Sequence, residues 1–499
     1  MKKKSIIFSI VILTISLSSC KKYLDINKDP DNILATQAPL DLILTNTTVN
    51  IGFDGGSDLF RYAALLSQQL SGQTTGGETQ TQAYEKYNIQ SADVNNQWAS
   101  TYANTLNDLE TIIKQAGTIQ APHYSGVAKL LKAFTYQLLV DVWGDIPFSE
   151  ALKNTENLFP EYDNDEEIYK GIIKLIDEGI TEINSTTSSV SPGSNSTIYA
   201  GSFSSKKANW IKFANTLKLR IYIHYSKFDK AFMLSQINAL VGNVATTFFT
   251  SNADNFEMPF FNETERQNPI HQFQIRREDY LFANAFMVNL MNANSDPRRA
   301  TYFTEFPAGS GNYLGALSGD PASKKYSRMH TFLRGATTSV GAPGSDGSYT
   351  ESAIKYTGDA PIRLLTYAEY NFIRAEAAVY GAPGDAETFF KEGITASMKS
   401  AGVSDANIAA YLVAKGTLTG TESEKIKRII EEKYVASFGV MVEPWTDWRR
   451  TGFPAISKVG NAVTTDIPRS LPYPQTEIDL NTNGPGQKPD LLVRVFWDK

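Results

Sequence analysis

One short segment near the start of the chain holds residue types that could bind a metal ion or act as a nucleophile. Cys20 is the only cysteine among 499 residues, and Asp25–Asp29 places Asp, Asn and Asp at the first, third and fifth positions of an EF-hand-like calcium loop. Such a loop needs glycine at its sixth position and a bidentate glutamate at its twelfth, where this chain has Pro30 and Thr36. The pattern therefore favours a turn, in which Asp and Asn cap their own backbone, over a calcium site.

Other catalytic patterns are missing from the sequence. The four histidines are His123, His224, His271 and His330. They form no HExxH motif and no i,i+4 pair, so the sequence indicates no helical zinc site, and it contains neither a Gly-x-Ser-x-Gly elbow nor a Gly-Lys-Ser/Thr phosphate loop. A glycosidase needs two facing carboxylates, which 53 Asp and Glu residues could supply, although no pair is singled out. We predict no catalytic residue, no metal and no cofactor, with a surface glycoside hydrolase as the alternative.

The segment before Cys20 has the layout of an export signal. Three lysines precede the mostly apolar run Ile6–Leu17, which is well short of the roughly 20 residues of a membrane-spanning helix. Leu17–Cys20 resembles the bacterial lipobox. This resemblance implies that residues 1–19 are a removed signal peptide and that Cys20 carries thioether-linked lipid and an N-acyl chain such as palmitate. Residues 20–38 then form a lipidated tether; a buried free cysteine is the alternative.

Charge and composition exclude some classes of function. The net charge of −6 becomes −9 when the leader and its three lysines are removed, and no basic run beyond the leader exceeds two residues. We therefore expect no nucleic-acid partner, because phosphate binding needs a concentrated basic surface. With 42% apolar residues and no cysteine left for disulfides, the mature chain must be stabilised by a large hydrophobic core.

The elements that must position any site are mostly helices. Apolar residues from Trp98 to Ile113 recur at spacings of three and four, which predicts one face of a helix over Val94–Gln115. Further helices are predicted at 127–142, Asp165–Asn184, Ser205–Tyr225, Ala231–Val241, Tyr280–Met291, Tyr367–Val379, Ala386–Ala401 and Thr421–Phe438. Consecutive helical pairs predict a mainly α fold with a tetratricopeptide-like scaffold, long irregular loops and a few short strands.

Two long stretches interrupt the helical pattern. Residues near 242–274 and 302–361 are rich in Gly, Ser, Pro, Asn and aromatic residues, and Ser71–Gln82 consists almost wholly of Ser, Gly, Thr and Gln. Irregular backbone is difficult to satisfy inside a core, so these loops must lie at the surface, where they often carry function. We predict a single helical domain over residues 39–499 with these loop-rich insertions.

Several motifs resemble the SusD/RagB family of nutrient-binding outer-membrane lipoproteins. The matching blocks are Asp141–Leu152, Ser295–Arg298, Leu365–Ala378, Glu432–Tyr434 with Trp445–Pro454, and Ile467–Glu477, together with the lipobox and Tyr23–Asn27. They follow one another in the order of the family and cover nearly the whole chain. Ser470 and Phe496 depart from the usual pattern near the end of the chain.

The resemblance implies a binding protein and not an enzyme. Such a protein is lipid-anchored to the outer membrane, faces outward and forms a lid on a TonB-dependent, SusC-like transporter, to which it delivers an oligosaccharide or a peptide. A helical-repeat scaffold without a small ligand is a further alternative. The Trp445–Pro454 block is predicted to be structural, because it lies on the helical scaffold and not in the long loops. Its aromatic residues can pack while Arg449 and Arg450 pair with acidic groups such as Glu369 or Glu376.

Aromatic side chains and arginine in or near the loops are candidates for ligand contact, because aromatic rings stack on sugar rings while amides and Arg bind hydroxyl groups. The candidates are Tyr84, Tyr87, Trp98, Tyr313, Tyr326, Phe332 and Arg334. Trp98 begins a regular apolar face, so core packing is its alternative role. For the loop aromatics the alternative is contact with the transporter.

Overall fold

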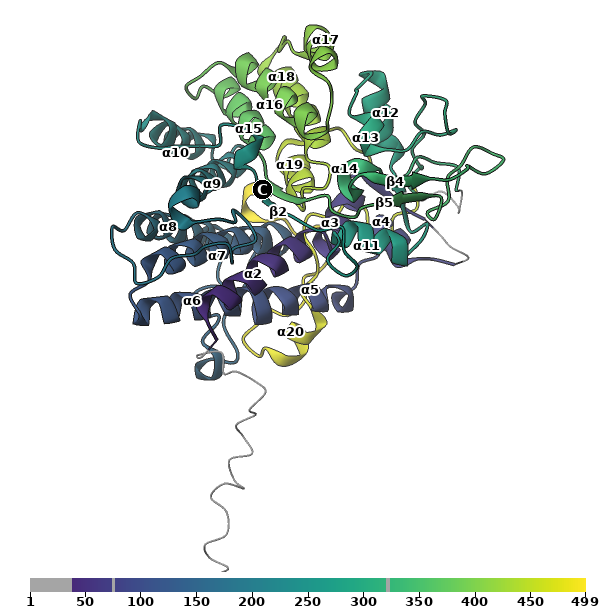
Figure 1. The fold of residues 1–499 in the computed structure, drawn as a ribbon. Helices are drawn as coiled ribbons and strands as arrows, with labels where there is room; N and C mark the ends of the chain where they lie inside the picture. Colours follow the sequence, from purple (N-terminus) through teal and green to yellow (C-terminus); the bar gives the residue numbers. More distant parts are fainter. Residues whose placement is uncertain (1–37, 74–76, 320–323) are drawn as a thin grey trace, which may run out of the picture.

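The computed structural model describes residues 38–73, 77–319 and 324–499 (Figure 1). The predicted signal peptide, Cys20 and all but the last residue of the predicted tether lie outside this range. The described residues are mainly helical, with short strands that pair two by two, which confirms the predicted fold class. In this part of the chain, no helix combines the length and the apolar character needed to cross a membrane.

The helices follow one another along the whole described chain. In the first half they are α2 (Leu40–Gly55), α3 (Asp58–Leu66), α4 (Gln80–Glu85), α5 (Asn95–Ala99), α6 (Asn107–Thr118), α7 (Pro122–Trp143), α8 (Asp165–Ile183), α9 (Phe203–His224) and α10 (Lys230–Gly242). In the second half they are α11 (Pro269–Arg276), α12 (Ala285–Ala293), α13 (Arg299–Tyr302), α14 (Thr331–Arg334), α15 (Tyr367–Val379), α16 (Ala386–Ser400), α17 (Asp405–Lys415), α18 (Glu422–Ala436), α19 (Glu443–Thr451) and α20 (Gln475–Leu480).

The described residues form three antiparallel strand pairs, two of which join distant parts of the chain. They are β1 (Leu70–Gly72) with β3 (Leu281–Ala283), β2 (Phe256–Met258) with β6 (Ile362–Leu365), and β4 (Thr337–Val340) with β5 (Ile354–Tyr356). Most predicted helices are present with ends shifted by a few residues. The helix predicted over Tyr280–Met291 begins only at Ala285, because the preceding residues pair as β3.

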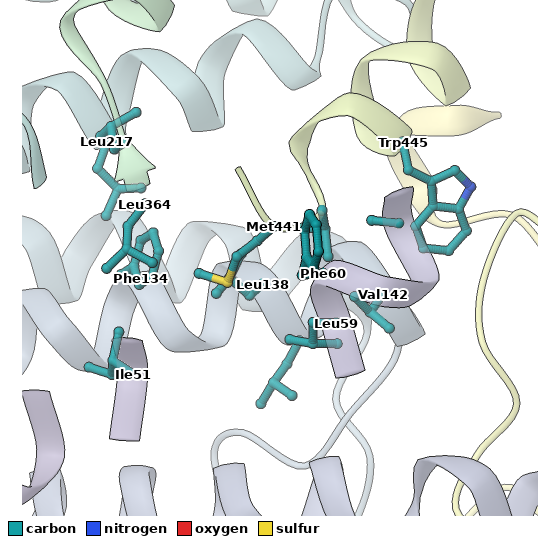
Figure 2. Packing of buried hydrophobic residues seen from close by; sticks show 14 of the residues in the cluster. Ile51, Leu59, Phe60, Phe134, Leu138, Val142, Leu217, Leu364, Met441 and Trp445 are labelled. Atoms are coloured by element: carbon teal, nitrogen blue, oxygen red, sulfur yellow. The ribbon is translucent and has the colours of Figure 1, made fainter. Parts of the chain in front are cut away.

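Consecutive helices pack into the predicted pairs. Helix α7 packs against α6 and α8, and α15 packs against α16 and α18, while α11, β4 and β5 lie on the opposite side of the molecule from α6 and α8 (Figure 1). Figure 2 shows the central packing, where Leu59 and Phe60 of α3 lie close to Leu138 of α7 and to Met441. Helix α7 is buried along most of its length, and its buried side chains include the polar Thr135, Gln137 and Asp141 as well as apolar ones.

Glycines allow the end of α2 to approach its neighbours. A methyl group added at Gly56 would lie 2.6 Å from Pro269 Cγ and 2.7 Å from Ile362 Cδ1, and one added at Gly52 would overlap Met258. Only glycine permits this spacing without movement of the neighbouring side chains. The α2–α3 turn is therefore held directly against the start of α11 and against β6.

The Trp445–Pro454 block lies in the scaffold. Arg450 pairs with Glu376 of α15 and with Asp447, and all three side chains are buried, which confirms the predicted pairing for Arg450. For Arg449 the prediction is wrong. Its guanidinium packs between two tryptophan rings, 3.7 Å from Trp445 and 4.7 Å from Trp497, because α19 directs it toward the C-terminal segment and away from α15.

Candidate functional site

An open pocket of about 520 Å³ lies where α2, α3, α4, α5 and α11 meet. Its walls combine two phenylalanines with amide, hydroxyl, carboxylate and guanidinium groups. Phe53 is 46% exposed and Phe273 is half-buried, so both contribute apolar surface to a pocket that is otherwise polar. This volume lies within the range of small-molecule sites in proteins.

A second cavity, of about 660 Å³, lies beside the C-terminal segment. Its two large aromatic residues, Trp143 and Tyr473, are only 1% and 6% exposed. The ammonium group of Lys488 donates hydrogen bonds to the backbone carbonyls of Trp143, at 2.7 Å, and Leu471, at 2.9 Å. This cavity therefore offers little aromatic surface to a ligand, and the smaller pocket is the better candidate.

Helix α11 carries one wall of the candidate pocket, and its first residues explain why it forms there. The Asn268 side chain accepts hydrogen bonds from the backbone N–H groups of Ile270 (2.7 Å) and His271 (3.3 Å), and Pro269 occupies the first helical position. The Asn268 amide also donates to the carbonyl of Ala360 at 2.7 Å. The start of α11 is therefore capped and tied to the scaffold.

An arginine covers the ring of Phe273. The guanidinium of Arg61, on α3, lies 4.4 Å from the centre of this ring and is paired with Asp58 one turn earlier. A cation over an aromatic face stabilises both side chains, most strongly when water is partly excluded. Arg61 and Phe273 thus form one rigid wall from two segments that lie far apart in the sequence.

Asp54 lies on the opposite side of the pocket, next to α5. Ser100 donates a hydrogen bond of 3.1 Å to its carboxylate. Burial raises the pKa of Asp54 to about 7, and the nearby charge of Asp58 adds to this effect, while hydrogen bonds from Ser100 and Gln97 oppose it. Ser100 begins a π-helical stretch, Ser100–Leu106, a departure from α-helical geometry that often accompanies functional sites.

Amide and guanidinium groups provide further hydrogen-bonding capacity. Gln80 and Asn96 are exposed at the rim, and Gln272 lies half-buried on α11. Arg276 and Arg277 are exposed at the end of α11. The pocket can therefore surround a polar ligand with donors and acceptors while apolar parts of that ligand pack on phenylalanine.

Tyr84 and Trp98 were predicted to contact ligand and lie next to this pocket, but in the protein interior. Tyr84 is 1% exposed, and its hydroxyl accepts a 2.5 Å hydrogen bond from Gln80. Trp98 is 5% exposed and packs against Tyr102 and Trp143, with ring centres 4.7 and 5.3 Å apart. Tyr84 therefore holds Gln80 of the rim, whereas the ring partners of Trp98 do not line this pocket.

Three more predicted residues are also buried. Tyr87 accepts a hydrogen bond from the backbone of Val459, and Phe332 lies 3.8 Å beneath the Arg363 guanidinium. Arg334 pairs with Glu351, and its guanidinium lies 4.1 Å from the ring centre of Tyr356. The exposed fractions of Tyr87, Phe332 and Arg334 are 1%, 5% and 2%. Their environments fit a structural role in the loop region.

Tyr313 and Tyr326 remain half-buried, so ligand contact stays a prediction for both. Tyr313 lines a separate cavity of about 210 Å³ together with His330 and Tyr349. Burial and the charge of Arg334 lower the pKa of His330 to about 4, which keeps this histidine neutral at physiological pH. The sequence therefore placed candidates in two separate regions of the fold.

The pocket residues themselves were missed by the sequence analysis. Phe53, Arg61 and Phe273 belong to α2, α3 and α11, none of which was predicted. One local signal was present. Asn268 followed by Pro269 is a typical helix start, and it lies inside a stretch that was predicted to be loop.

Comparison with known proteins identifies the family. A sequence profile described as "Starch-binding associating with outer membrane" matches residues 30–474. The chain belongs to this SusD-like family. SusD-like proteins are binding proteins rather than enzymes, and the family is associated with the outer membrane.

Solved structures share the fold of this SusD-like chain. A chitin-binding protein is 25% identical, with a TM-score of 0.75 over 92% of this chain and 100% of that one. A SusD homolog from Bacteroides uniformis is 22% identical, with a TM-score of 0.72 over 92% and 99% of the two chains. A chitin-binding SusD homolog from Flavobacterium johnsoniae is 21% identical, with a TM-score of 0.72 over 92% and 97%. No curated protein sequence matches the chain.

Proposed function

We propose that this SusD-like protein captures an oligosaccharide in the pocket between α2, α3, α5 and α11 and delivers it to a TonB-dependent, SusC-like transporter. The observation that carries the proposal is the pairing of Phe53 and Phe273 with surrounding amide and guanidinium groups in one open pocket. Sugar rings present C–H faces that pack on aromatic rings and hydroxyl groups that bind amides. The family's description as starch-binding and the chitin-binding relative support a glycan over a peptide.

The anchoring part of the proposal rests on the sequence. Cys20, lipidated after removal of residues 1–19, holds the protein at the outer membrane, and residues 20–38 connect it to the folded domain that starts at residue 39. A Cys20→Ser protein is expected in the soluble fraction, whereas the unaltered protein partitions with membranes. Tyr313 and Tyr326 are proposed as further contacts, either to a long glycan or to the transporter.

The chain offers a matched control for testing the pocket. Phe261 is 42% exposed and has the Arg266 guanidinium 4.3 Å above its ring, nearly the same arrangement as Phe273 with Arg61, but it lies outside the pocket. We expect Phe273→Ala to weaken glycan binding at least tenfold and Phe261→Ala to leave it unchanged. Stacking of one sugar on one aromatic ring accounts for a change of this size.

The experiment screens a glycan panel against the unaltered protein and then measures each variant by isothermal titration calorimetry. Phe53→Ala serves as a second pocket variant, because its exposed side chain can be removed without opening the core. Circular dichroism verifies the fold of every variant. Equal binding by all variants, no binding of any glycan, or release of glycan products by the protein would each refute the proposal.

A further inference from the structure

The charges of the candidate pocket do not balance. Arg61 and Asp58 pair with each other, so they contribute little net charge. Arg276 and Arg277 also line the pocket, and neither has an ion-pair partner among residues 38–73, 77–319 and 324–499. The one remaining carboxylate is Asp54, and burial raises its pKa to about 7, so it carries only part of its charge at neutral pH. The pocket is therefore cationic on a protein whose net charge is −6.

Most arginines in the described part of the chain have an ion-pair partner, and others that have none, such as Arg363 and Arg449, are buried against aromatic rings, whereas Arg276 and Arg277 are exposed. Arg220, Arg298 and Arg450 form buried ion pairs, and even the exposed Arg266 is 2.6 Å from Glu263. A cation in the last turn of a helix interacts favourably with the helix dipole, which gives Arg276 a structural alternative. That role affects the stability of α11, whereas a ligand-binding role affects affinity, so the two can be separated by experiment.

We propose that the pocket selects oligosaccharides that carry carboxylate groups, as uronic-acid glycans do. The sugar rings pack on Phe53 and Phe273, while the carboxylates bind the guanidinium groups of Arg276 and Arg277. Arginine suits this role because its planar fork donates two parallel hydrogen bonds to one carboxylate. Arg276 is the last residue of α11 and Arg277 follows it outside the helix. In this proposal the two arginines bind carboxylates on different sugar units. This proposal rests on the function proposed above.

The test compares acidic and neutral ligands of equal length. Isothermal titration calorimetry at pH 7 and low salt uses hexasaccharides of galacturonate and of mannuronate, with maltohexaose and chitohexaose as neutral probes. We expect at least one acidic hexasaccharide to bind at least tenfold more tightly than either neutral one. Raising the salt concentration should weaken the acidic ligand severalfold and leave the neutral ligands unaffected, because exposed ion pairs are screened.

Two double variants test whether Arg276 and Arg277 cause the preference for acidic ligands. The double variant Arg276→Gln with Arg277→Gln is expected to weaken the acidic ligands at least tenfold and the neutral ones much less, so that most of the preference for acidic ligands is lost. The control Arg266→Gln with Lys427→Gln removes the same charge outside the pocket and is expected to keep the preference. A preference that survives in the pocket variant, or that falls equally in the control, would overturn the proposal.

The remaining outcomes separate this inference from the proposed function. If neutral hexasaccharides bind as tightly as acidic ones and Phe273→Ala abolishes that binding, glycan capture stands and acidic selectivity is wrong. If no hexasaccharide binds, both are wrong. Hexaglutamate provides a peptide polyanion; if it binds as tightly as the acidic glycans and Phe273→Ala has no effect, the site recognises charge alone and the glycan assignment is overturned.

Discussion

Asp54→Asn should make the protein more stable relative to the unaltered chain as the pH rises. Burial disfavours the charged carboxylate and raises the pKa of Asp54 to about 7 in the folded state, whereas a free aspartate has a pKa of 3.8. Between these two values the folded state binds more protons than the unfolded state, and each increase in pH costs stability. Asparagine has no proton to lose. The stability that Asp54 contributes at low pH is thus lost as the pH rises from about 4 to about 7.

The size of the effect follows from the shift. Each pKa unit corresponds to about 1.4 kcal/mol, so raising the pKa of Asp54 from 3.8 to about 7 can change the free energy of unfolding by at most about 4 kcal/mol. Water in the pocket reaches the half-buried carboxylate and screens its charge, so about half of this, about 2 kcal/mol, is the better expectation. If screening halves the rise in pKa, about a third of this 2 kcal/mol falls between pH 5 and pH 8, whereas the full rise would place about 2.5 kcal/mol there. We therefore expect Asp54→Asn to gain about 0.5 to 2.5 kcal/mol relative to the unaltered protein between pH 5 and pH 8.

Urea unfolding of both proteins at pH 5 and pH 8 measures this gain directly. Asp385→Asn is the matched control. Asp385 is an exposed helix cap whose side chain accepts a 2.7 Å hydrogen bond from the Thr388 backbone, and hydrogen bonds to Thr388 lower its pKa. Asp385 is ionised at pH 5 and at pH 8, in the folded and in the unfolded state. Its replacement should therefore change the free energy of unfolding by the same amount at both pH values. A pH-independent difference for Asp54→Asn would show that the carboxylate is not desolvated as the structure indicates.

Two further substitutions test how the scaffold holds the pocket. Arg450→Met should destabilise the protein by about 3–5 kcal/mol in urea unfolding, because Glu376 is left buried and unpaired. Adding Glu376→Gln to the Arg450→Met protein should recover part of the lost stability. A loss below about 1 kcal/mol for Arg450→Met would contradict the importance of this buried pair. Gly56→Ala should cost about 1–3 kcal/mol and weaken glycan binding, because the new methyl group overlaps Pro269 at the start of α11. Gly117→Ala, in a helix with open space around that position, should instead gain up to about 1 kcal/mol, and similar effects at both glycines would refute the packing argument.

Much of the scaffold could be predicted because its helices are regular and amphipathic or wholly buried. Helix α15 begins and ends at the predicted residues, and α8 and α16 differ only at their ends. By contrast, α2 was missed because Thr45–Thr48 and Gly52 interrupt the apolar pattern. Thr47 and Thr48 are buried within α2 because their hydroxyl groups donate to backbone carbonyls one turn earlier in the same helix. Gly52 allows Met258 of β2 to approach, which only the tertiary structure shows.

The ligand residues were harder to predict than the helices. The signals used were aromatic or arginine character and a place in or near the loops, and they selected Tyr84 and Trp98, which the fold buries next to the pocket. Tyrosine and tryptophan are used in this core because their polar atoms find partners there. The exposed rings are phenylalanines, and their role depends on Arg61 and on neighbours from distant segments, which no local pattern contains.

The motifs that identify the family lie away from the candidate pocket, and this separation has a consequence for function. Arg450 and Trp445, from the most specific block, are buried in the scaffold, as is Glu376 from another block. The pocket is instead built from residues 53–61, 80–100 and 269–277, which the scaffold brings together through contacts such as Gly56 with Pro269. Substitution of exposed residues such as Arg276 changes the charge of the pocket at little cost to stability. Membership of the family therefore accounts for the fold, and the ligand must be inferred from the charge and exposed rings of this pocket.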